Sequence, residues 1–200
     1  MEQPVYRPAT ADDNRFIAEM LEMSSDGVAL IEWSEAAQEA GDRTPLDIGA
    51  ELYTADTGDY SHRNCRVAQV AGERAGLLLS FPMRTRDTEE PAPAPPFDGS
   101  DVFAPYKYLE APDTWYVCGV AVRPRYRGRG IGTGLMELAR EQALEHGYAQ
   151  LSLVVFEENT AAVRLYRRLG YEIAKRAPIV PHPLIRCEGD ALLMVAPAHR

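Results

Sequence analysis

The sequence predicts an α/β (α+β) protein. About seven short runs have the β-branched and aromatic composition of strands, and longer runs between them carry apolar residues at helical spacing. With 200 residues, of which 46% are hydrophobic, the chain is long enough to bury one sizeable core. We therefore expect a single domain over residues 1–200.

The first part of the chain alternates strands and helices. Thr10, Asp12 and Asp13 are typical of a helix N-terminus, and Gly41 and Pro45 are breakers between two helical runs. The elements expected are a strand at 5–9, helices at 14–23, 28–40 and 46–53, and a hairpin of strands at 65–70 and 74–83.

Residues 84–114 differ in composition from the rest. Prolines concentrate there, and proline is unfavourable in helix interiors and inner strands. We expect a long loop with one helical turn near residues 103–109, where the aromatic residues Phe103, Tyr106 and Tyr108 gather. A lid over a binding pocket and a plain mobile insertion both fit this composition.

A strand at 115–122 leads into the glycine-rich stretch 125–134, and a helix follows at 135–144. Backbone N–H groups at a helix N-terminus, together with the helix dipole, favour a bound phosphate. The turn also carries four arginines, in a chain whose formal net charge is −9: Arg123, Arg125, Arg127 and Arg129. The dinucleotide fingerprint G-x-G-x-x-G fails at Thr133, and no nucleotide P-loop occurs.

A second segment has helix punctuation at both ends. After a strand at 149–155, Asn159 is suited to an N-cap and Gly170 to a left-handed C′ position. The apolar stripe between them consists of Ala162, Leu165, Tyr166 and Leu169. Strands at 172–176 and 191–195, with a proline-containing loop at 177–189, complete the expected elements.

Composition narrows the function classes. No apolar run reaches 18 residues and no secretory signal opens the chain, so we expect a cytoplasmic protein with no membrane partner. Cys65, Cys118 and Cys187 are far apart and in no C-x-x-C pair, which favours reduced thiols and argues against a zinc site. A sequence pI near 5.0 argues against a nucleic-acid partner and is compatible with a cationic amine.

Two motifs carry a resemblance. The pattern [Arg/Gln]-x-x-Gly-x-[Gly/Ala] occurs at Arg125, Gly128 and Gly130. The pattern N-x-x-A-x-x-L-Y-x-x-x-G-[Phe/Tyr] occurs at Asn159, Ala162, Leu165, Tyr166, Gly170 and Tyr171. Together, from about Tyr116 to Ile173, they resemble the acetyl-CoA motifs of the GNAT superfamily of N-acetyltransferases.

The resemblance implies a mixed, mostly antiparallel central sheet flanked by helices, with a splayed cofactor-binding strand pair. It implies acetyl-CoA as acyl donor and no metal. Tyr166 would be the catalytic acid that protonates the thiolate, and it would also contact the cofactor. The other cofactor-binding residues implied are Val120, Ala121, Val122, Arg127, Gly128, Arg129, Gly130, Ile131, Gly132, Thr133 and Asn159.

The expected activity is direct transfer of an acetyl group, in a ternary complex, to a primary amine of a small molecule or peptide. The alternative is a non-catalytic acyl-CoA-binding regulatory protein with the same fold. We also expect a homodimer, by analogy with many members of the superfamily.

The general base stays open. Some members carry a glutamate five residues before the asparagine, and this chain has Val154 there. Glu110, Glu157, His62 and His182 remain candidates, and water can take the proton if the amine binds neutral.

Overall fold

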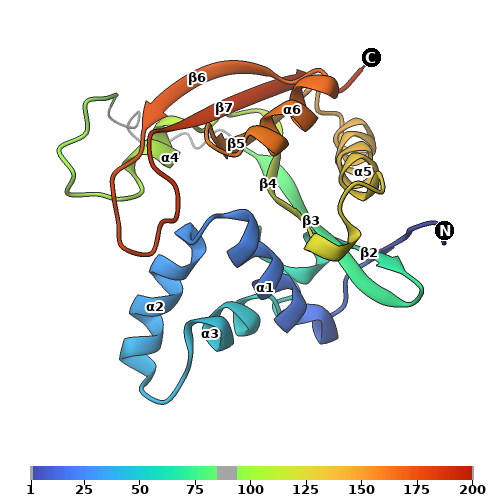
Figure 1. Cartoon of the computed structure of the whole chain (residues 1–200), viewed down its shortest axis with the longest axis horizontal. Coiled ribbons are helices and arrows are strands. Elements are labelled where there is room, and N and C mark those ends of the chain that lie inside the picture. The colour runs from blue at the N-terminus through green and yellow to red at the C-terminus, as the bar shows by residue number, and fades with distance from the viewer. Residues whose placement is uncertain (1, 85–93, 200) are drawn as a thin grey trace. The chain divides into compact units, whose positions relative to one another are not determined.

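The computed structural model describes residues 2–84 and 94–199 (Figure 1). The strands are β1 (Val5–Pro8), β2 (Cys65–Val70), β3 (Glu73–Met83), β4 (Thr114–Val122), β5 (Gln150–Phe156), β6 (Glu172–Pro178) and β7 (Asp190–Pro197). The helices are α1 (Asn14–Ser24), α2 (Val28–Ala40), α3 (Pro45–Leu52), α4 (Ala104–Tyr108), α5 (Ile131–Glu145) and α6 (Thr160–Arg168), and short 3₁₀ turns are η1 (Ala11–Asp13), η2 (His62–Asn64) and η3 (Pro124–Tyr126).

The seven strands form one sheet in the order β1-β2-β3-β4-β5-β7-β6. The pairs β1–β2, β2–β3, β5–β7 and β6–β7 are antiparallel, and β4–β5 is parallel. The predicted mixed, mostly antiparallel sheet flanked by helices is therefore confirmed. The register of the parallel pair covers Trp115–Val117 of β4 and Leu151–Leu153 of β5, although both strands continue beyond it.

The chain divides into two compact units. The first comprises Met1–Phe81 and Cys118–Leu138, and the second comprises Pro82–Val117 and Ala139–Arg200. Strand β4 and helix α5 contribute residues to both units, and β4 changes unit directly after Val117, the last residue of its register with β5.

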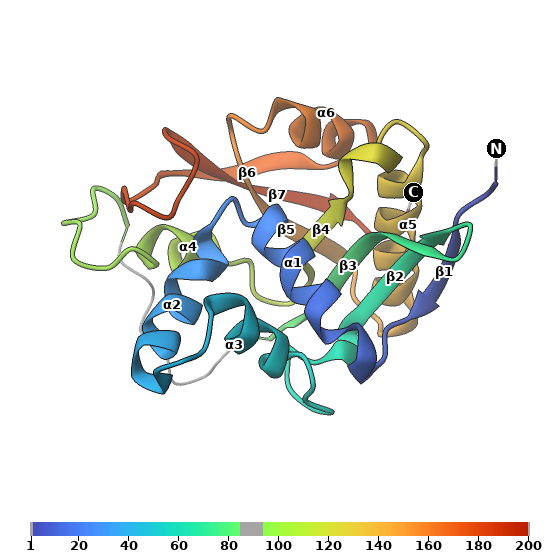
Figure 2. The ribbon, with the colours of Figure 1, turned by 60° about the horizontal axis from the view of Figure 1, so that its bottom comes forward.

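In the first unit, α1, α2 and α3 pack on one another (Figure 1). Gly49 of α3 makes this close packing feasible, since a Cβ there would lie 2.7 Å from the Trp33 ring of α2. Two glycines of the sheet serve the same purpose: a Cβ at Gly119 would meet Leu21 of α1, and a Cβ at Gly76 would meet Ile131 and Leu135 of α5. Figure 2 shows α1 in front of these strands and α5 behind them.

A buried carboxylate joins β1 to the start of α1. The side chain of Asp13 is 1% exposed and accepts two hydrogen bonds from the Arg7 guanidinium, at 2.7 and 2.9 Å. The Arg74 side chain adds an ion pair at 2.9 Å, and the Thr10 amide donates a hydrogen bond at 2.9 Å. Burial alone would raise the pKa of Asp13, but these hydrogen bonds and charges outweigh it and lower the pKa to about 2.

The second unit contains a buried guanidinium that likewise links separate elements through hydrogen bonds. Arg140 of α5, 8% exposed, donates to the backbone carbonyls of Pro197 and Ala198 after β7 and of Leu169 after α6. The Trp115 ring of β4 lies 4.7 Å from the His146 ring, directly after α5. These contacts fix the second half of α5 against the end of β7, the end of α6 and β4.

The expected elements agree with the structure to within a few residues at each end. The predicted helical turn near residues 103–109 is confirmed as α4. Residues 85–93 of the proline-rich loop lie outside the described residues, so its role as a lid stays a prediction.

Replacing Asp13 with Asn should destabilise the protein by about 3 kcal/mol at neutral pH, the low end for breaking a buried pair, because both arginines keep access to water. The folded-state pKa of Asp13 lies below its ordinary value of 3.8, so its stabilisation is present above that value and is lost as the pH falls toward about 2. Urea unfolding between pH 7 and pH 2 should show that the difference in free energy of unfolding between the wild-type protein and Asp13→Asn shrinks as the pH falls from 3.8 toward about 2.

The exposed neighbour provides the control, and Asp12→Asn should change stability little at any pH. A difference in free energy of unfolding between the wild-type protein and Asp13→Asn that stayed constant down to pH 2 would contradict the role assigned to the ionised carboxylate.

Candidate functional site

The glycine-rich loop between β4 and α5 has the backbone conformation that its sequence predicts. Gly128 and Gly130 have φ of 74° and 78°, a left-handed region that favours glycine. The Gly134 amide donates to the Gly130 carbonyl at 3.0 Å, which begins the helical hydrogen-bond ladder. The amides of the first turn precede that ladder and are the donors a helix N-terminus offers to an anion. Such an arrangement can hold a phosphate or another anion.

Gly134, at the end of the same glycine-rich stretch, has a packing role. A Cβ at this position would lie 2.0 Å from the hydroxyl oxygen of Tyr6 on β1. Its lack of a side chain lets α5 approach β1 closely, so this glycine serves the fold and is not needed to explain phosphate binding.

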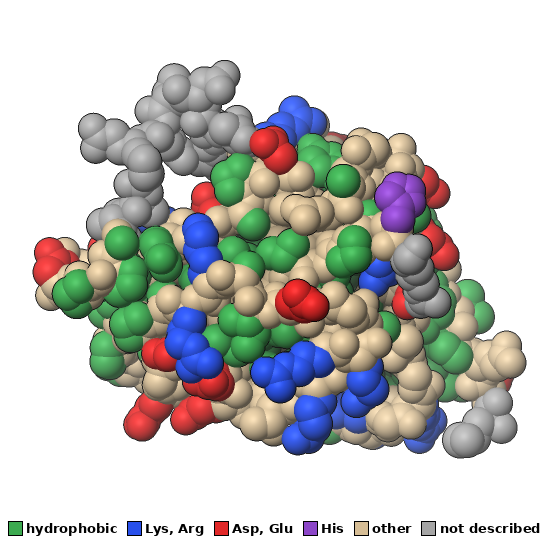
Figure 3. Space-filling view, turned by 90° about the horizontal axis from the view of Figure 1, so that it is seen from above, with side chains coloured by type: hydrophobic (Ala, Val, Ile, Leu, Met, Phe, Trp, Pro, Cys, Tyr) green, Lys and Arg blue, Asp and Glu red, His purple; other side chains and the backbone are tan. Residues whose placement is uncertain are grey.

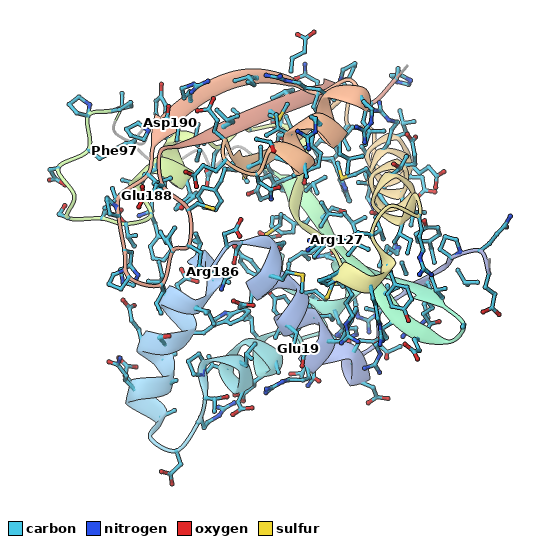
Figure 4. All side chains as sticks on the ribbon, in the orientation of Figure 1. Glu19, Phe97, Arg127, Arg186, Glu188 and Asp190 are labelled. Carbon is cyan, nitrogen blue, oxygen red and sulfur yellow. The ribbon has the colours of Figure 1, made fainter. Side chains whose placement is uncertain are left out.

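The four arginines of the turn are engaged differently. Arg123 pairs with Glu19 of α1 at 3.4 Å, and Arg125 pairs with Glu73 of β3. Arg127 donates to the Val122 carbonyl at 3.0 Å and lies 3.7 Å from the Met23 sulfur; Figure 4 labels it, with Glu19 on α1. Arg129 makes no ion pair within residues 2–84 and 94–199, and its guanidinium lies 5.4 Å from the centre of the Tyr126 ring. The turn is therefore less positive than four arginines suggest.

The remaining predicted loop and strand residues lie in the same unit. Val120, Ala121 and Val122 form the C-terminal end of β4, and the next residue, Arg123, donates its amide to the Ala75 carbonyl of β3 at 2.9 Å. Ile131, Gly132 and Thr133 form the first turn of α5.

Helix α6, in the second unit, has the predicted N-cap. The Asn159 side chain accepts a hydrogen bond from the Ala162 amide at 3.2 Å. Tyr166 is 7% exposed and its ring lies 5.9 Å from that of Tyr171. Burial raises the pKa of Tyr166, so the phenol is protonated at neutral pH, as a proton donor must be. The exposed side of α6 carries Arg164, Arg167 and Arg168. Figure 3 shows one face of the molecule, on which basic side chains lie among acidic and hydrophobic ones.

The candidate bases have different surroundings. Glu157 pairs with Arg176 at 2.6 Å, and the His182 Nδ1 atom accepts a hydrogen bond from the Leu184 amide at 3.2 Å. Glu110 is exposed. His62 is 8% exposed, its Nε2 atom lies 3.8 Å from an Asp56 carboxylate oxygen, and its buried Nδ1 atom has no hydrogen-bond partner among the described residues.

The aromatic cluster of the 94–113 segment packs within the second unit. Tyr108 meets the Phe97 ring edge-on and lies under the Lys175 ammonium at 5.0 Å, and Tyr106 meets Phe156 edge-on. Figure 4 shows Phe97 on this segment and Arg186, Glu188 and Asp190 along the β6–β7 loop and the start of β7. Sequence reasoning found the cluster but not its partners, because Phe156 and Lys175 are distant in sequence.

Among the described residues, no group of three or more His, Cys, Asp or Glu side chains is arranged to hold a metal ion. No described helix combines the length and the apolarity that crossing a membrane requires.

Comparison with known proteins identifies the family. The model of the acetyltransferase (GNAT) family matches residues 31–171. Thialysine N-epsilon-acetyltransferase of Sus scrofa is 38% identical over 85 residues, which cover 40% of this chain and 49% of that protein. L-2,4-diaminobutyric acid acetyltransferase of Nocardia farcinica is 35% identical over 85 residues, covering 40% and 44%. The chain thus matches about half the length of these relatives.

Solved structures share the fold. The crystal structure of an acetyltransferase superposes with a TM-score of 0.65 at 21% identity, covering 98% of this chain and all of that one. The ribosomal-protein-S18-alanine N-acetyltransferase of Escherichia coli gives a TM-score of 0.59 at 16% identity, covering 99% and 96%. A chain of the NatC complex bound to Gag peptide and CoA gives a TM-score of 0.59 at 18% identity, covering 98% and 99%.

The positive-φ glycines provide a test of the loop. Gly130→Ala places a side chain both in a strained backbone conformation and beside the free amides, so CoA binding should be lost. Gly147, beyond the other end of α5, has the same φ of 78°. Gly147→Ala therefore introduces the same backbone strain, but at a position away from the amides of the first helical turn. Both should lose about 1–2 kcal/mol of stability, and only Gly130→Ala should lose affinity in calorimetric titration with CoA.

Equal CoA affinity in the two folded variants would remove this loop from the binding site. Because Gly130 has positive φ, the bulkier Gly130→Val would confound strain with steric exclusion, and the alanine pair separates them.

Proposed function

Since the chain belongs to the acetyltransferase (GNAT) family, we propose that it is an acetyl-CoA-dependent N-acetyltransferase acting on a primary amine. The observation that supports this most directly is the β4–α5 loop. Two left-handed glycines and the start of a helix present amide donors there, at the positions where the phosphate-binding motif occurs.

The chemistry proposed is direct acetyl transfer. The amine nitrogen attacks the thioester carbonyl carbon, a C–N bond forms, and the C–S bond breaks as the tetrahedral intermediate collapses. Backbone N–H groups of Val120, Ala121 and Val122 are proposed to stabilise the oxygen that carries the developing negative charge. The sulfur leaves as a thiolate and gains one proton, and the nitrogen loses one.

Tyr166 is the proposed acid. Its phenol is protonated at neutral pH because burial raises its pKa, and it lies in the second motif, seven residues after the helix cap Asn159. Asn159 is proposed to combine the cap, which the structure contains, with a contact to the cofactor.

The acceptor is proposed to be a small molecule or peptide with a primary amine. The relatives named above are named for thialysine, acetylated at its ε nitrogen, and for L-2,4-diaminobutyric acid. Diamino acids of this kind are therefore the first acceptors to test. We also propose a cytoplasmic location, consistent with the unbridged Cys65, Cys118 and Cys187, and a homodimer, which light scattering can test.

A thiol-release assay tests the function. Purified protein with acetyl-CoA and a panel of amines should release free CoA in proportion to acetylated amine. CoA binding without transfer to any amine of the panel would support instead a non-catalytic acyl-CoA-binding protein.

Tyr166→Phe removes one oxygen and little volume, so CoA affinity should be retained while kcat falls by about 10²- to 10⁴-fold, the usual contribution of a positioned acid. Steady-state kinetics beside thermal unfolding would measure this. The buried neighbour gives a matched control: Tyr171→Phe also removes a buried hydroxyl, and it should lower the melting temperature more than kcat. A near-normal kcat in a less stable Tyr166→Phe protein would assign Tyr166 to packing.

A further inference from the structure

One side chain of the loop is held from outside the loop. Tyr126 is 8% exposed, and its hydroxyl donates a hydrogen bond of 2.6 Å to the Glu73 carboxylate. The same carboxylate oxygen pairs with Arg125. Two guanidinium groups lie over the Tyr126 ring, that of Arg125 at 4.9 Å and that of Arg129 at 5.4 Å from the ring centre.

Glu73 begins β3, directly after the turn formed by Ala71 and Gly72. The next residues of that strand hold other parts of the same loop. The Ala75 carbonyl accepts the Arg123 amide at 2.9 Å, and Gly76 lies against Ile131 and Leu135 of α5. The start of β3 thus contacts the beginning, the middle and the end of the segment that carries the free amides.

The charge states are consistent with this arrangement. The hydrogen bond from Tyr126 and the charge of Arg125 hold the pKa of Glu73 below its ordinary value, so the carboxylate is ionised at neutral pH. The same hydrogen bond raises the pKa of Tyr126, which therefore keeps its proton.

We propose that Glu73 is a positioning residue for cofactor binding: through Tyr126 and Arg125 it fixes the β4–α5 loop, and it leaves Arg129 as the loop guanidinium available to a cofactor phosphate. We call the side chains of Glu73, Tyr126 and Arg125 the loop clamp. This inference rests on the proposed function, because it takes a CoA thioester as the ligand of the loop.

The test measures CoA affinity by calorimetry in four variants. Glu73→Gln and Tyr126→Phe should each weaken CoA binding about tenfold, as expected for losing one charge-assisted hydrogen bond. The double variant should be little worse than either single one, because both changes disrupt the same clamp. Glu51→Gln is the control: it breaks a comparable exposed pair between Glu51 of α3 and Arg43, which precedes that helix, far from the loop in sequence, and it should leave CoA affinity unchanged.

Kinetics distinguish positioning from general stability. With acetyl-CoA as the varied substrate, the clamp variants should show a raised KM with kcat within about twofold of wild type, because uniform binding is lost and the chemical step is intact. Arg129→Gln should also weaken CoA binding, and less so in the Glu73→Gln background, where the loop is no longer held.

Two results would overturn the proposal: clamp variants that bind CoA as tightly as the wild-type protein, or losses that add in the double variant and follow the melting temperature. A wild-type protein that binds no CoA would instead overturn the proposed function, and the clamp's ligand with it.

Discussion

The site depends on the first amides of α5, which have no acceptor within the helix itself. A helix N-terminus with unpaired donors cannot hold itself in place through its own backbone, so neighbouring groups must fix it. Here the packing of Gly134 against Tyr6 and of Gly76 against Ile131 sets the position of the helix. Side chains then set the conformation of the exposed loop ahead of it. The preference of the two loop glycines for positive φ completes the arrangement without placing a side chain near the amides.

The charges of the loop also divide into those that stabilise the loop and those that remain available to a ligand. In a chain with a net charge of −9, a cluster of arginines suggests a strongly positive binding surface. The structure shows that Arg123 and Arg125 are paired with carboxylates, and that Arg127 donates to the backbone of its own segment. Most of the guanidinium groups therefore stabilise the loop itself. In the proposed site, attraction for an anion would come from the helix N-terminus and from Arg129, which makes no ion pair among the described residues.

The elements of the fold could be predicted from sequence because their signals are local. Turn residues, helix caps and apolar spacing placed each strand and helix close to its observed bounds, and Asn159 caps α6 as its sequence position indicates. Long-range contacts carry no comparable signal. Nothing near Glu73 in sequence indicates that it accepts a hydrogen bond from Tyr126, 53 residues later. The packing role of Gly134 likewise depends on Tyr6, which lies near the start of the chain. The glycine pattern alone could not separate phosphate-binding from packing glycines.

The candidate bases differ in their hydrogen-bond partners, which the sequence did not indicate. In His182, the Nδ1 atom already accepts a hydrogen bond from the Leu184 amide. The Glu157 carboxylate is engaged by the Arg176 guanidinium. His62 differs from both: its buried Nδ1 atom has no hydrogen-bond partner among the described residues, and its Nε2 atom lies 3.8 Å from an Asp56 carboxylate oxygen. Since the phenol of Tyr166 carries its proton at neutral pH, it can donate a proton but cannot also accept one, so acid and base roles must fall on different side chains, or the amine must arrive already neutral.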